Sequence, residues 1–321
     1  MDEFKKECPV DSPLPYAKFE HPEITAKGET RAHVALTQLE TLWFNTGSLC
    51  NLSCQGCYMD SSPTNDRLAY ISTCDVETFL NEIITQNMTV QEIGFTGGEP
   101  FMNPQIIEIL TLCLERGFDV LVLSNAMKPL HHHKEALLRL KEKYGRKLGV
   151  RVSVDHYRAK DHEKLRGAQS WEMMIEGLSW LSQNKFKLAV AGRTLWQEGE
   201  DVARAGYEKM FAQYAISLNA ADPATLVLFP EMDVDADVPE ITVACWDILG
   251  VRPDAMMCAT SRMVIRRKGD DVAKVVPCTL LPYDPKFEMG TRLSTSGGPV
   301  SLNHPHCAKF CVLGGGSCSK A

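Results

Sequence analysis

The sequence of 321 residues predicts an α/β fold whose parallel sheet curls into an open, partial barrel, followed by a small cysteine-rich domain. Between residues 41 and 232, six short runs rich in apolar and β-branched residues alternate with five longer amphipathic stretches. Strands that alternate with helices in this way form a parallel sheet with right-handed crossovers. The mean spacing of about 32 residues matches the size of one βαβ repeat.

The predicted strands are LWFN (42–45), EIGFTGG (92–98), DVLVLSN (119–125), LGVRVSVD (148–155), FKLAVAG (186–192) and TLVLFPE (225–231). Between them, apolar residues recur at three- and four-residue spacing, which is typical of helices with one buried face. The predicted helices are residues 75–86, 104–117, 134–145, 171–183 and 201–214. Ligands on a parallel sheet bind at the C-terminal ends of the strands, so we expect the site there.

Three segments are expected along the chain. Residues 1–40 show no clear period and are predicted to be a packed or partly mobile arm, and residues 41–239 form the barrel. Residues 240–321 lose the alternation, and the short β-like runs MVIRR and AKVVP lie among proline, glycine and cysteine. This pattern favours a small C-terminal domain organised by metal.

Composition limits the classes of partner. With 34 Lys+Arg and 41 Asp+Glu the net charge is −7, so no basic surface for nucleic acid is expected. The N-terminus lacks the apolar core of a signal peptide, and no apolar run approaches the ~18 residues of a membrane span. We expect a cytoplasmic protein with no membrane partner.

Nine of the 12 cysteines fall into two groups, which predicts two metal sites. Cys50, Cys54 and Cys57 follow the first strand in the spacing C-x3-C-x2-C. A [4Fe–4S] cluster usually takes four cysteines, so three local thiolates leave one iron open. The alternative is a structural zinc site completed by a distant cysteine.

The second strand ends in the segment GFTGGEP (94–100). Gly97 and Gly98 allow a ligand to approach the backbone closely. Glu99 precedes a proline and is therefore expected to be extended, with its carboxylate aimed beyond the strand end toward an ammonium group. The alternative is a turn that uses glycine for sharpness.

The CNLSCQGC loop followed by GGEP, on six βα units, resembles the radical S-adenosylmethionine (radical SAM) enzymes. The resemblance covers residues 41–232 and extends into the tail. It implies a partial (β/α)6 TIM-like barrel in which Cys50, Cys54 and Cys57 hold a [4Fe–4S] cluster. The open iron would chelate S-adenosylmethionine, and an electron from a donor such as flavodoxin or ferredoxin would release a 5′-deoxyadenosyl radical that abstracts a substrate hydrogen.

The resemblance also implies a binding site for S-adenosylmethionine. Gly97, Gly98 and Glu99 match the segment that binds the methionyl amino group. Ser124 and Asn125 match a polar pair that faces the ribose or carboxylate. In the run SVDHYRAKDHEKLRG, Ser153 and Arg166 match a serine and an arginine seen in the subgroup with C-terminal cysteine domains.

For Arg166 and for the ring that contacts adenine, more than one interpretation is open. Arg166 is expected either to form a forked contact with the methionyl carboxylate or to form a surface salt bridge. The residue before the third cysteine is commonly aromatic in the family, but here it is Gly56, and Tyr58 is the candidate ring for the adenine.

The tail, which contains CATSRMVIRRKGDDVAKVVPC and HCAKFCVLGGGSC, resembles the SPASM or Twitch domains that hold auxiliary clusters. Its final spacing fits the shorter Twitch type and predicts one auxiliary [4Fe–4S] cluster. The expected ligands are Cys258, Cys278 and Cys307, with Cys311 or Cys318 as the fourth. A zinc ribbon is the alternative for this region. Cys245 is expected in the core, and His304 and His306 are expected to be structural; for all three, ligation of a cluster is the alternative.

Substrate groups give the weakest signals. Glu231 ends the sixth strand, where an inward carboxylate would position a substrate or take a proton. Asp155 and Arg193 end two other strands and are expected to be either a structural ion pair or catalytic groups.

We therefore expect a radical SAM enzyme that abstracts hydrogen from an organic substrate, followed by oxidation or bond formation. A small molecule is favoured over a peptide, because 40 residues before the first strand leave little room for a recognition domain. The alternatives outside this class are a zinc-stabilised binding protein and an iron–sulfur electron carrier.

Overall fold

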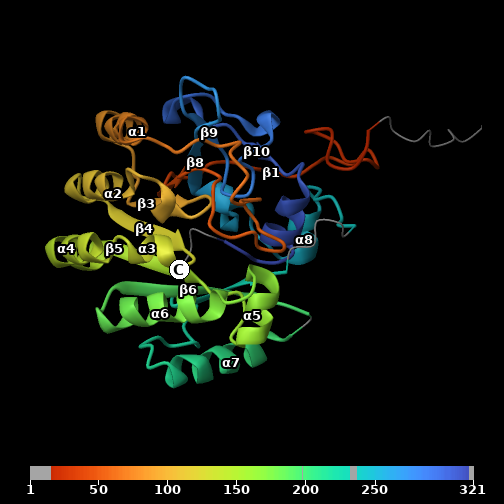
Figure 1. Cartoon of the computed structure of the whole chain (residues 1–321). Helices are drawn as coiled ribbons and strands as arrows, with labels where there is room; N and C mark the ends of the chain where they lie inside the picture. The colour runs from red at the N-terminus through yellow and green to blue at the C-terminus, as the bar shows by residue number, and fades with distance from the viewer. Residues whose placement is uncertain (1–15, 197, 232–236, 318–321) are drawn as a thin grey trace, which may run out of the picture.

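The computed structural model describes residues 16–196, 198–231 and 237–317. Its main element is an eight-stranded sheet in the order β7-β6-β5-β4-β3-β2-β8-β9 (Figure 1). The strands are β2 (Thr41–Asn45), β3 (Glu92–Thr96), β4 (Asp119–Ser124), β5 (Leu148–Ser153), β6 (Lys187–Thr194), β7 (Leu226–Pro230), β8 (Ser261–Ile265) and β9 (Lys274–Val276). Strands β2 to β7 pair in parallel and in chain order, which confirms the predicted α/β fold and its six strands.

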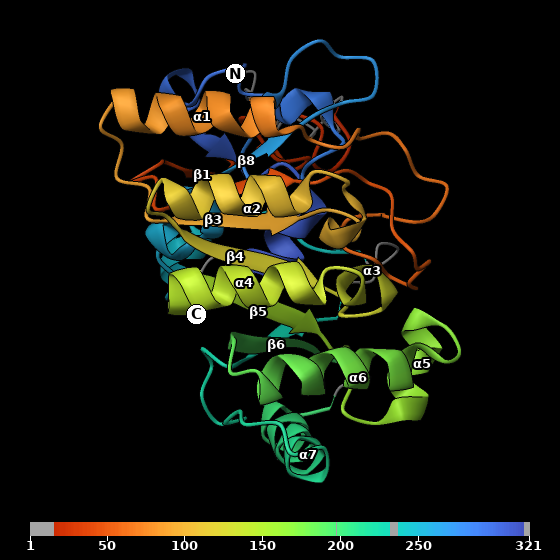
Figure 2. The ribbon, with the colours of Figure 1, turned by 60° about the vertical axis from the view of Figure 1, so that its left-hand side comes forward.

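The five predicted helices are present within a few residues of their expected bounds: α1 (Thr73–Thr85), α2 (Ile106–Glu115), α4 (Lys134–Tyr144), α6 (Ser170–Gln183) and α7 (Glu200–Gln213). Figure 2 shows α1, α2, α4 and α6 side by side on one face of the sheet. The structure adds three short helices that we did not predict: α3 (Lys128–His131), α5 (Ala159–Arg166) and α8 (Cys245–Leu249). Helical turns are also present at Pro100–Met102, Gly145–Lys147, Pro253–Ala255, Met257–Ala259, Pro285–Phe287, Leu293–Thr295 and, as a π-helix, Cys307–Val312.

Two apolar clusters form on the two faces of the sheet. Alternate residues of a strand point to opposite faces, and in β2 the side chains of Leu42 and Phe44 pack with the helices. Trp43, between them, belongs to a second cluster that includes Met263 and Phe310 of the tail. The inner face of the barrel is therefore covered by the C-terminal part of the chain.

The tail also extends the sheet. β8 pairs in parallel with β2, from Thr41 opposite Ser261 to Phe44 opposite Val264, and β9 pairs antiparallel with β8. The hairpin expected between Cys258 and Cys278 is thus present. It belongs to the same sheet as the barrel strands, and the domain boundary at residue 240 stays a prediction.

The described part of the arm is packed against the tail. β1 (His33–Val34) pairs antiparallel with β10 (Val300–Ser301). Arg31 is fully buried and forms an ion pair of 2.5 Å with Glu240. Among the described residues, no helix has both the length and the apolar character that a membrane crossing requires.

Candidate functional site

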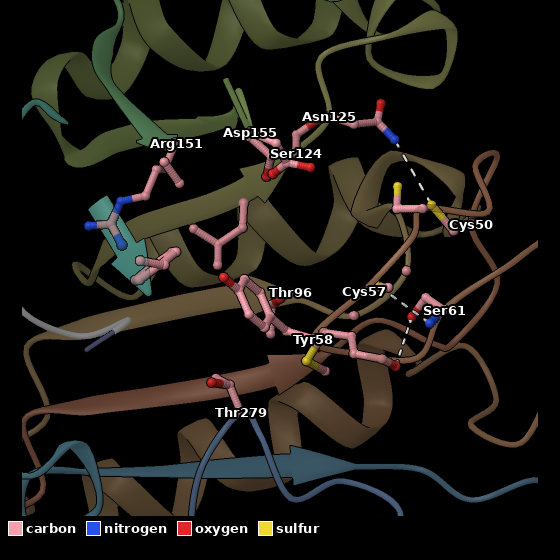
Figure 3. A pocket seen from close by; sticks show the side chains of 18 of the residues that line it. Cys50, Cys57, Tyr58, Ser61, Thr96, Ser124, Asn125, Arg151, Asp155 and Thr279 are labelled. Atoms are coloured by element: carbon pink, nitrogen blue, oxygen red, sulfur yellow. Dashed lines mark hydrogen bonds between the residues drawn. The ribbon is translucent and has the colours of Figure 1, made fainter. Parts of the chain in front are cut away.

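A cleft of about 980 Å³, including its mouth, opens at the C-terminal ends of the strands (Figure 3). This is the edge at which the sequence predicts the site. The cleft gathers most of the predicted site residues: Cys50, Cys54, Cys57, Gly97, Gly98, Ser124, Asn125, Ser153, Asp155, Arg166 and Arg193. Tyr58 lines it as well, together with apolar side chains that the sequence analysis missed: Leu123, Phe229, Leu280 and Phe310.

The three cysteines of the CNLSCQGC loop are free thiols on one wall of this cleft. Burial raises the pKa of Cys50 to about 12 and also raises the pKa of Cys54, where the charges of Arg166 and Arg193 oppose the effect. Polar N–H groups lie near the sulfurs: the Asn125 amide nitrogen is 4.0 Å from Cys50 Sγ. A loop that holds one buried and two half-buried thiols beside donors and guanidinium groups is suited to hold them as metal-bound thiolates.

Within the described ranges, no three Cys, His, Asp or Glu side chains surround one point as the ligands of a single ion do. In a cubane each thiolate binds a different iron, so the ligands of a cluster need not converge in this way. Among the described residues the cleft is lined by three thiols and no fourth, which matches the cluster type in which one iron stays open. The donor set at Cys50, Cys54 and Cys57 therefore fits a [4Fe–4S] cluster.

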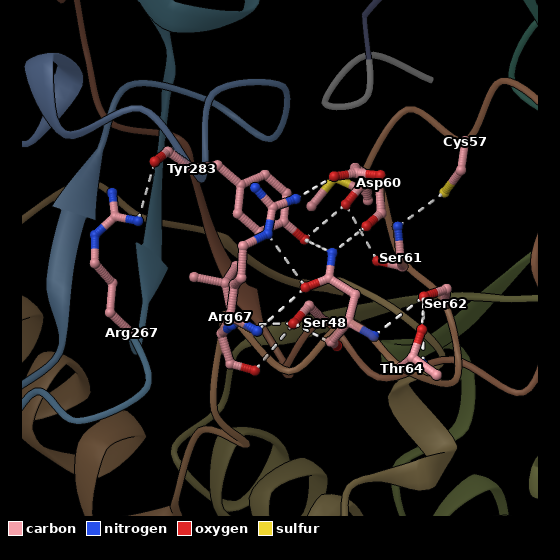
Figure 4. A network of polar contacts seen from close by, with 12 residues as sticks. Ser48, Cys57, Asp60, Ser61, Ser62, Thr64, Arg67, Arg267 and Tyr283 are labelled. Atoms are coloured by element: carbon pink, nitrogen blue, oxygen red, sulfur yellow. Dashed lines mark hydrogen bonds and ion pairs between the residues drawn. The ribbon is translucent and has the colours of Figure 1, made fainter.

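The segment after Cys57 is fastened to the tail (Figure 4). Arg67 pairs with Asp60, and its guanidinium carbon lies 3.8 Å from the centroid of the Tyr283 ring. The Tyr283 hydroxyl donates to the Met59 carbonyl at 2.8 Å, and Arg267 donates to the Tyr283 carbonyl at 3.2 Å. The cysteine loop is thus held from the tail side as well as from the barrel side.

The two glycines of GGEP serve close packing of the backbone. Gly97 has a φ of +131°, a conformation that favours glycine. A Cβ at Gly98 would overlap the carbonyl oxygen of Leu49, and the Gly98 N–H donates to the Gly47 carbonyl at 2.8 Å. The end of β3 therefore lies directly against the segment that leads into Cys50.

Glu99 does not point into the cleft, which corrects the orientation expected from the sequence. Its side chain is buried, and its carboxylate accepts hydrogen bonds from the Ser124 hydroxyl at 2.8 Å, the Asn125 N–H at 2.8 Å and the Phe101 N–H at 3.3 Å. Burial raises the pKa of Glu99 to about 7, although these three donors oppose the shift. The carboxylate holds the end of β4, where Ser124 and Asn125 do face the cleft.

Asp155 joins two arginines at the other side of the cleft. Arg166 Nε lies 2.8 Å and Arg166 Nη2 3.1 Å from its two carboxylate oxygens, and Arg193 Nε lies 3.1 Å from one of them. Burial opposes ionisation, but the two guanidinium groups hold the pKa of Asp155 at about 2. Asp155 and Arg193, each expected to be either part of an ion pair or a catalytic group, pair with each other, and the forked contact of Arg166 is made with Asp155. The Arg166 side chain is 11% exposed, so this pair is not a surface salt bridge.

Glu231 is a second correction. It follows β7, is exposed, and accepts a hydrogen bond from the Trp196 N–H at 3.1 Å instead of lining the cleft. Tyr58 takes the place beside that strand end. Its hydroxyl donates to the Pro230 carbonyl at 2.8 Å, and its ring lies edge-on to Phe310 with centroids 5.6 Å apart.

The tail gathers three further buried thiols, Cys258, Cys278 and Cys307. Burial raises the pKa of Cys258 to about 11 and that of Cys307 to about 12. Cys311 is half-buried, and Cys318 lies outside the described residues. Cys245 is half-buried beside Thr242 and packs against the inner apolar cluster.

Arg262 gives an independent test of whether a metal centre fits there. Its side chain is fully buried and donates to the carbonyls of Cys258 at 2.6 Å, Ser261 at 2.8 Å and Ser296 at 2.9 Å. Among the described residues no carboxylate pairs with it, and the ionisable groups whose negative forms would favour its charge are Cys258 and Cys278. A buried cation requires a counter-charge, and thiolates bound to metal would supply it.

His304 and His306 line a second cleft together with Cys54 and Cys57 of the cysteine loop. Their ring centroids lie 4.6 Å apart, and burial lowers the pKa of His304 to about 4. Burial lowers the pKa of His306 as well, and the structural role of both rings stays a prediction.

Comparison with known proteins identifies the family to which this chain belongs. The model of the Radical SAM superfamily matches residues 44–227, more than half of the chain. AlbA of Bacillus subtilis (strain 168), an antilisterial bacteriocin subtilosin biosynthesis protein, is 29% identical over 153 residues. That alignment covers 46% of this chain and 32% of AlbA, so the chain matches about a third of its relative's length.

Two solved structures have similar folds. SuiB of Streptococcus suis bound to S-adenosylmethionine has a TM-score of 0.54 at 13% identity, over 82% of this chain and 64% of SuiB. Native anSMEcpe with bound S-adenosylmethionine and Cp18Cys peptide has a TM-score of 0.55 at 14% identity, over 82% of this chain and 81% of that one. At these identities the likeness shows the fold alone, and the family model carries the assignment: the chain belongs to the radical SAM superfamily, whose members are enzymes that use a [4Fe–4S] cluster and S-adenosylmethionine.

Proposed function

We propose that this enzyme modifies a peptide by radical chemistry and that Cys50, Cys54 and Cys57 hold its [4Fe–4S] cluster. The observation that carries the proposal is the shared cleft, in which three thiols, the polar ends of β4 and β5 and apolar side chains from β7 and the tail face one another. When bound, the cluster and S-adenosylmethionine supply a 5′-deoxyadenosyl radical. The protein contributes binding, orientation and exclusion of water.

Each wall of the cleft has its own task in this proposal. Ser153 and Arg166 bind the methionyl carboxylate, and Asp155 fixes the plane of the guanidinium group. Ser124 and Asn125, held by the buried carboxylate of Glu99, orient the polar part of S-adenosylmethionine. The apolar side chains of Leu123, Phe229, Leu280 and Phe310 surround the substrate carbon and keep water away from the radical.

A peptide replaces the small molecule that the sequence favoured. AlbA is a bacteriocin biosynthesis protein, and anSMEcpe has been solved with a peptide. The described part of the arm also leaves the cleft free, because residues 30–34 pack against the tail. We further propose one auxiliary [4Fe–4S] cluster on Cys258, Cys278, Cys307 and either Cys311 or Cys318.

The proposal is tested by following the transfer of deuterium from a labelled substrate to 5′-deoxyadenosine. Anaerobically purified enzyme is reduced with dithionite and given S-adenosylmethionine with either a deuterated peptide fraction or a deuterated low-mass fraction of cell extract. Deuterium in 5′-deoxyadenosine is expected with the peptide fraction alone. Label from the low-mass fraction alone would show a small-molecule substrate. Formation of 5′-deoxyadenosine by the variant with Ala at residues 50, 54 and 57 would refute the cluster assignment.

A further inference from the structure

Arg193, the penultimate residue of β6, connects the barrel to the cysteine loop. Its side chain is 6% exposed, and it makes three contacts with different partners. Nε pairs with Asp155 at 3.1 Å, Nη1 donates to the carbonyl of Gly56 at 3.0 Å, and the guanidinium carbon lies 4.4 Å from the centroid of the Tyr58 ring. One guanidinium group thus touches the loop on both sides of Cys57.

The loop needs such a contact at this position. Gly56, between the second and third cysteines, is exposed and has a φ of +64°. The neighbouring Gln55 N–H donates to the Leu165 carbonyl at 2.7 Å, in the last turn of α5. These two hydrogen bonds tie the main chain between Cys54 and Cys57 to the barrel. Both hydrogen bonds are linked to Asp155. The donor to Gly56, Arg193, pairs with Asp155 itself, and Leu165 is followed in the chain by Arg166, which also pairs with Asp155.

We propose that Arg193 is a positioning residue for the cluster, and the inference rests on the proposed function of the cysteine loop. The guanidinium group of Arg193 fixes the positions of Gly56 and Tyr58. It thereby fixes the distance between the Cys54 and Cys57 thiolates. Its positive charge lies beside the main chain between Cys54 and Cys57 and favours the reduced cluster. Because Asp155 is shared, Arg193 and Arg166 are held beside each other by a single carboxylate.

Substitutions can separate the geometric task from the electrostatic one. Arg193→Met removes the charge and both hydrogen bonds. Arg193→Lys keeps a positive charge near Asp155, but one ammonium lacks the planar fork that reaches a carboxylate and a carbonyl at once. Arg166→Met is the matched control, because Arg166 shares Asp155 yet makes no hydrogen bond to the loop between the cysteines among the described contacts.

The experiment uses anaerobic holoenzyme and two readouts other than turnover. One is the rate of iron release to a chelator, and the other is the midpoint potential of the cluster whose EPR signal changes when S-adenosylmethionine is added. We expect Arg193→Met to release that iron at least several-fold faster and to have a lower potential. Arg193→Lys should release iron faster at a nearly unchanged potential. Arg166→Met should weaken S-adenosylmethionine binding more than it accelerates iron release.

The outcomes are distinguishable. If the parent enzyme shows no cluster that responds to S-adenosylmethionine, the proposed function is wrong, and the inference is overturned with it. If the parent shows that cluster but Arg193→Met keeps the parent's iron release and potential, only the inference is overturned. Circular dichroism and thermal melting identify a misfolded variant, and Arg193→Lys then decides through the same two readouts.

Discussion

The carboxylate of Glu99 is buried and accepts hydrogen bonds from donors of its own chain, two of them at the end of β4. Its pKa of about 7 lies above the ordinary value of 4.5, so the folded protein binds this proton more tightly than the unfolded chain does. Stability contributed by this group is therefore present below pH 4.5 and is lost as pH rises toward 7. The loss is on the order of 3 kcal/mol.

Glu99→Gln should remove that pH dependence. A neutral amide does not titrate, so the free energy of unfolding of the variant should change less between pH 5 and pH 7.5 than that of the parent. Anaerobic urea unfolding at both values measures the difference. Glu108→Gln, on α2, is the matched control. An equal slope in parent and Glu99→Gln would show that Glu99 does not titrate in this range.

Arg31 and Arg262 are both fully buried arginines that donate to main-chain carbonyls, yet only Arg31 has a carboxylate partner among the described residues. With Ala at residues 50, 54 and 57, we expect about four irons per chain to remain in the tail. Adding Arg262→Gln should lower this iron content severalfold, because the thiolates lose the cation that offsets their charge.

Arg31→Gln in the same background is the control, since it removes a buried arginine that pairs with Glu240. It should lower stability and leave the iron content unchanged. Iron and zinc are measured per chain by elemental analysis. Zinc in place of iron would show a structural ribbon, about eight irons would show two auxiliary clusters, and an unchanged iron content in Arg262→Gln would contradict the role of the charge.

At the scale of elements, β3 and the cysteine loop are in contact through the main chain. Gly98→Ala should displace the Leu49 carbonyl and with it Cys50, because a Cβ has no room there. Overpacking of this kind costs typically about 1–3 kcal/mol. We expect a lower melting temperature and a loss of iron. Gly199→Ala, where the added Cβ meets open space, should leave both unchanged. A Gly98→Ala protein with full iron content would contradict this prediction.

The elements that the sequence predicts are those with a local signal. The strands and five helices carry their own periodicity, and the C-x3-C-x2-C spacing places three thiols on one wall. Helix α5 has no such signal, because in AKDHEKLR only His162 is buried. The orientation of Glu99 depends on donors 25 and 26 residues away, and the bond from Arg193 to Gly56 spans 137 residues. Contacts of this range leave no pattern in the local sequence.

At the scale of the whole molecule, one sheet contains strands from both sides of the domain boundary predicted at residue 240. A chain that ends at residue 239 would leave β2 as an unpaired edge and would uncover Trp43. We expect this truncated chain to aggregate in size-exclusion chromatography. Supplying residues 240–321 as a second polypeptide during expression should restore part of the soluble protein. A monomeric truncated chain with the parent's melting temperature would show that the barrel folds without the tail.

The pairing of β2 with β8 also has a consequence for synthesis on the ribosome. β8 begins at Ser261, more than 200 residues after β2 ends at Asn45. At about 5–20 residues per second, roughly 10–40 s pass between the two strands. During that interval the loop of Cys50, Cys54 and Cys57 lacks the fastening to Tyr283 and is accessible to oxidants. Delivery of iron and sulfide to the nascent enzyme is therefore expected to follow translation of the tail, in a cell that keeps these thiols reduced until then.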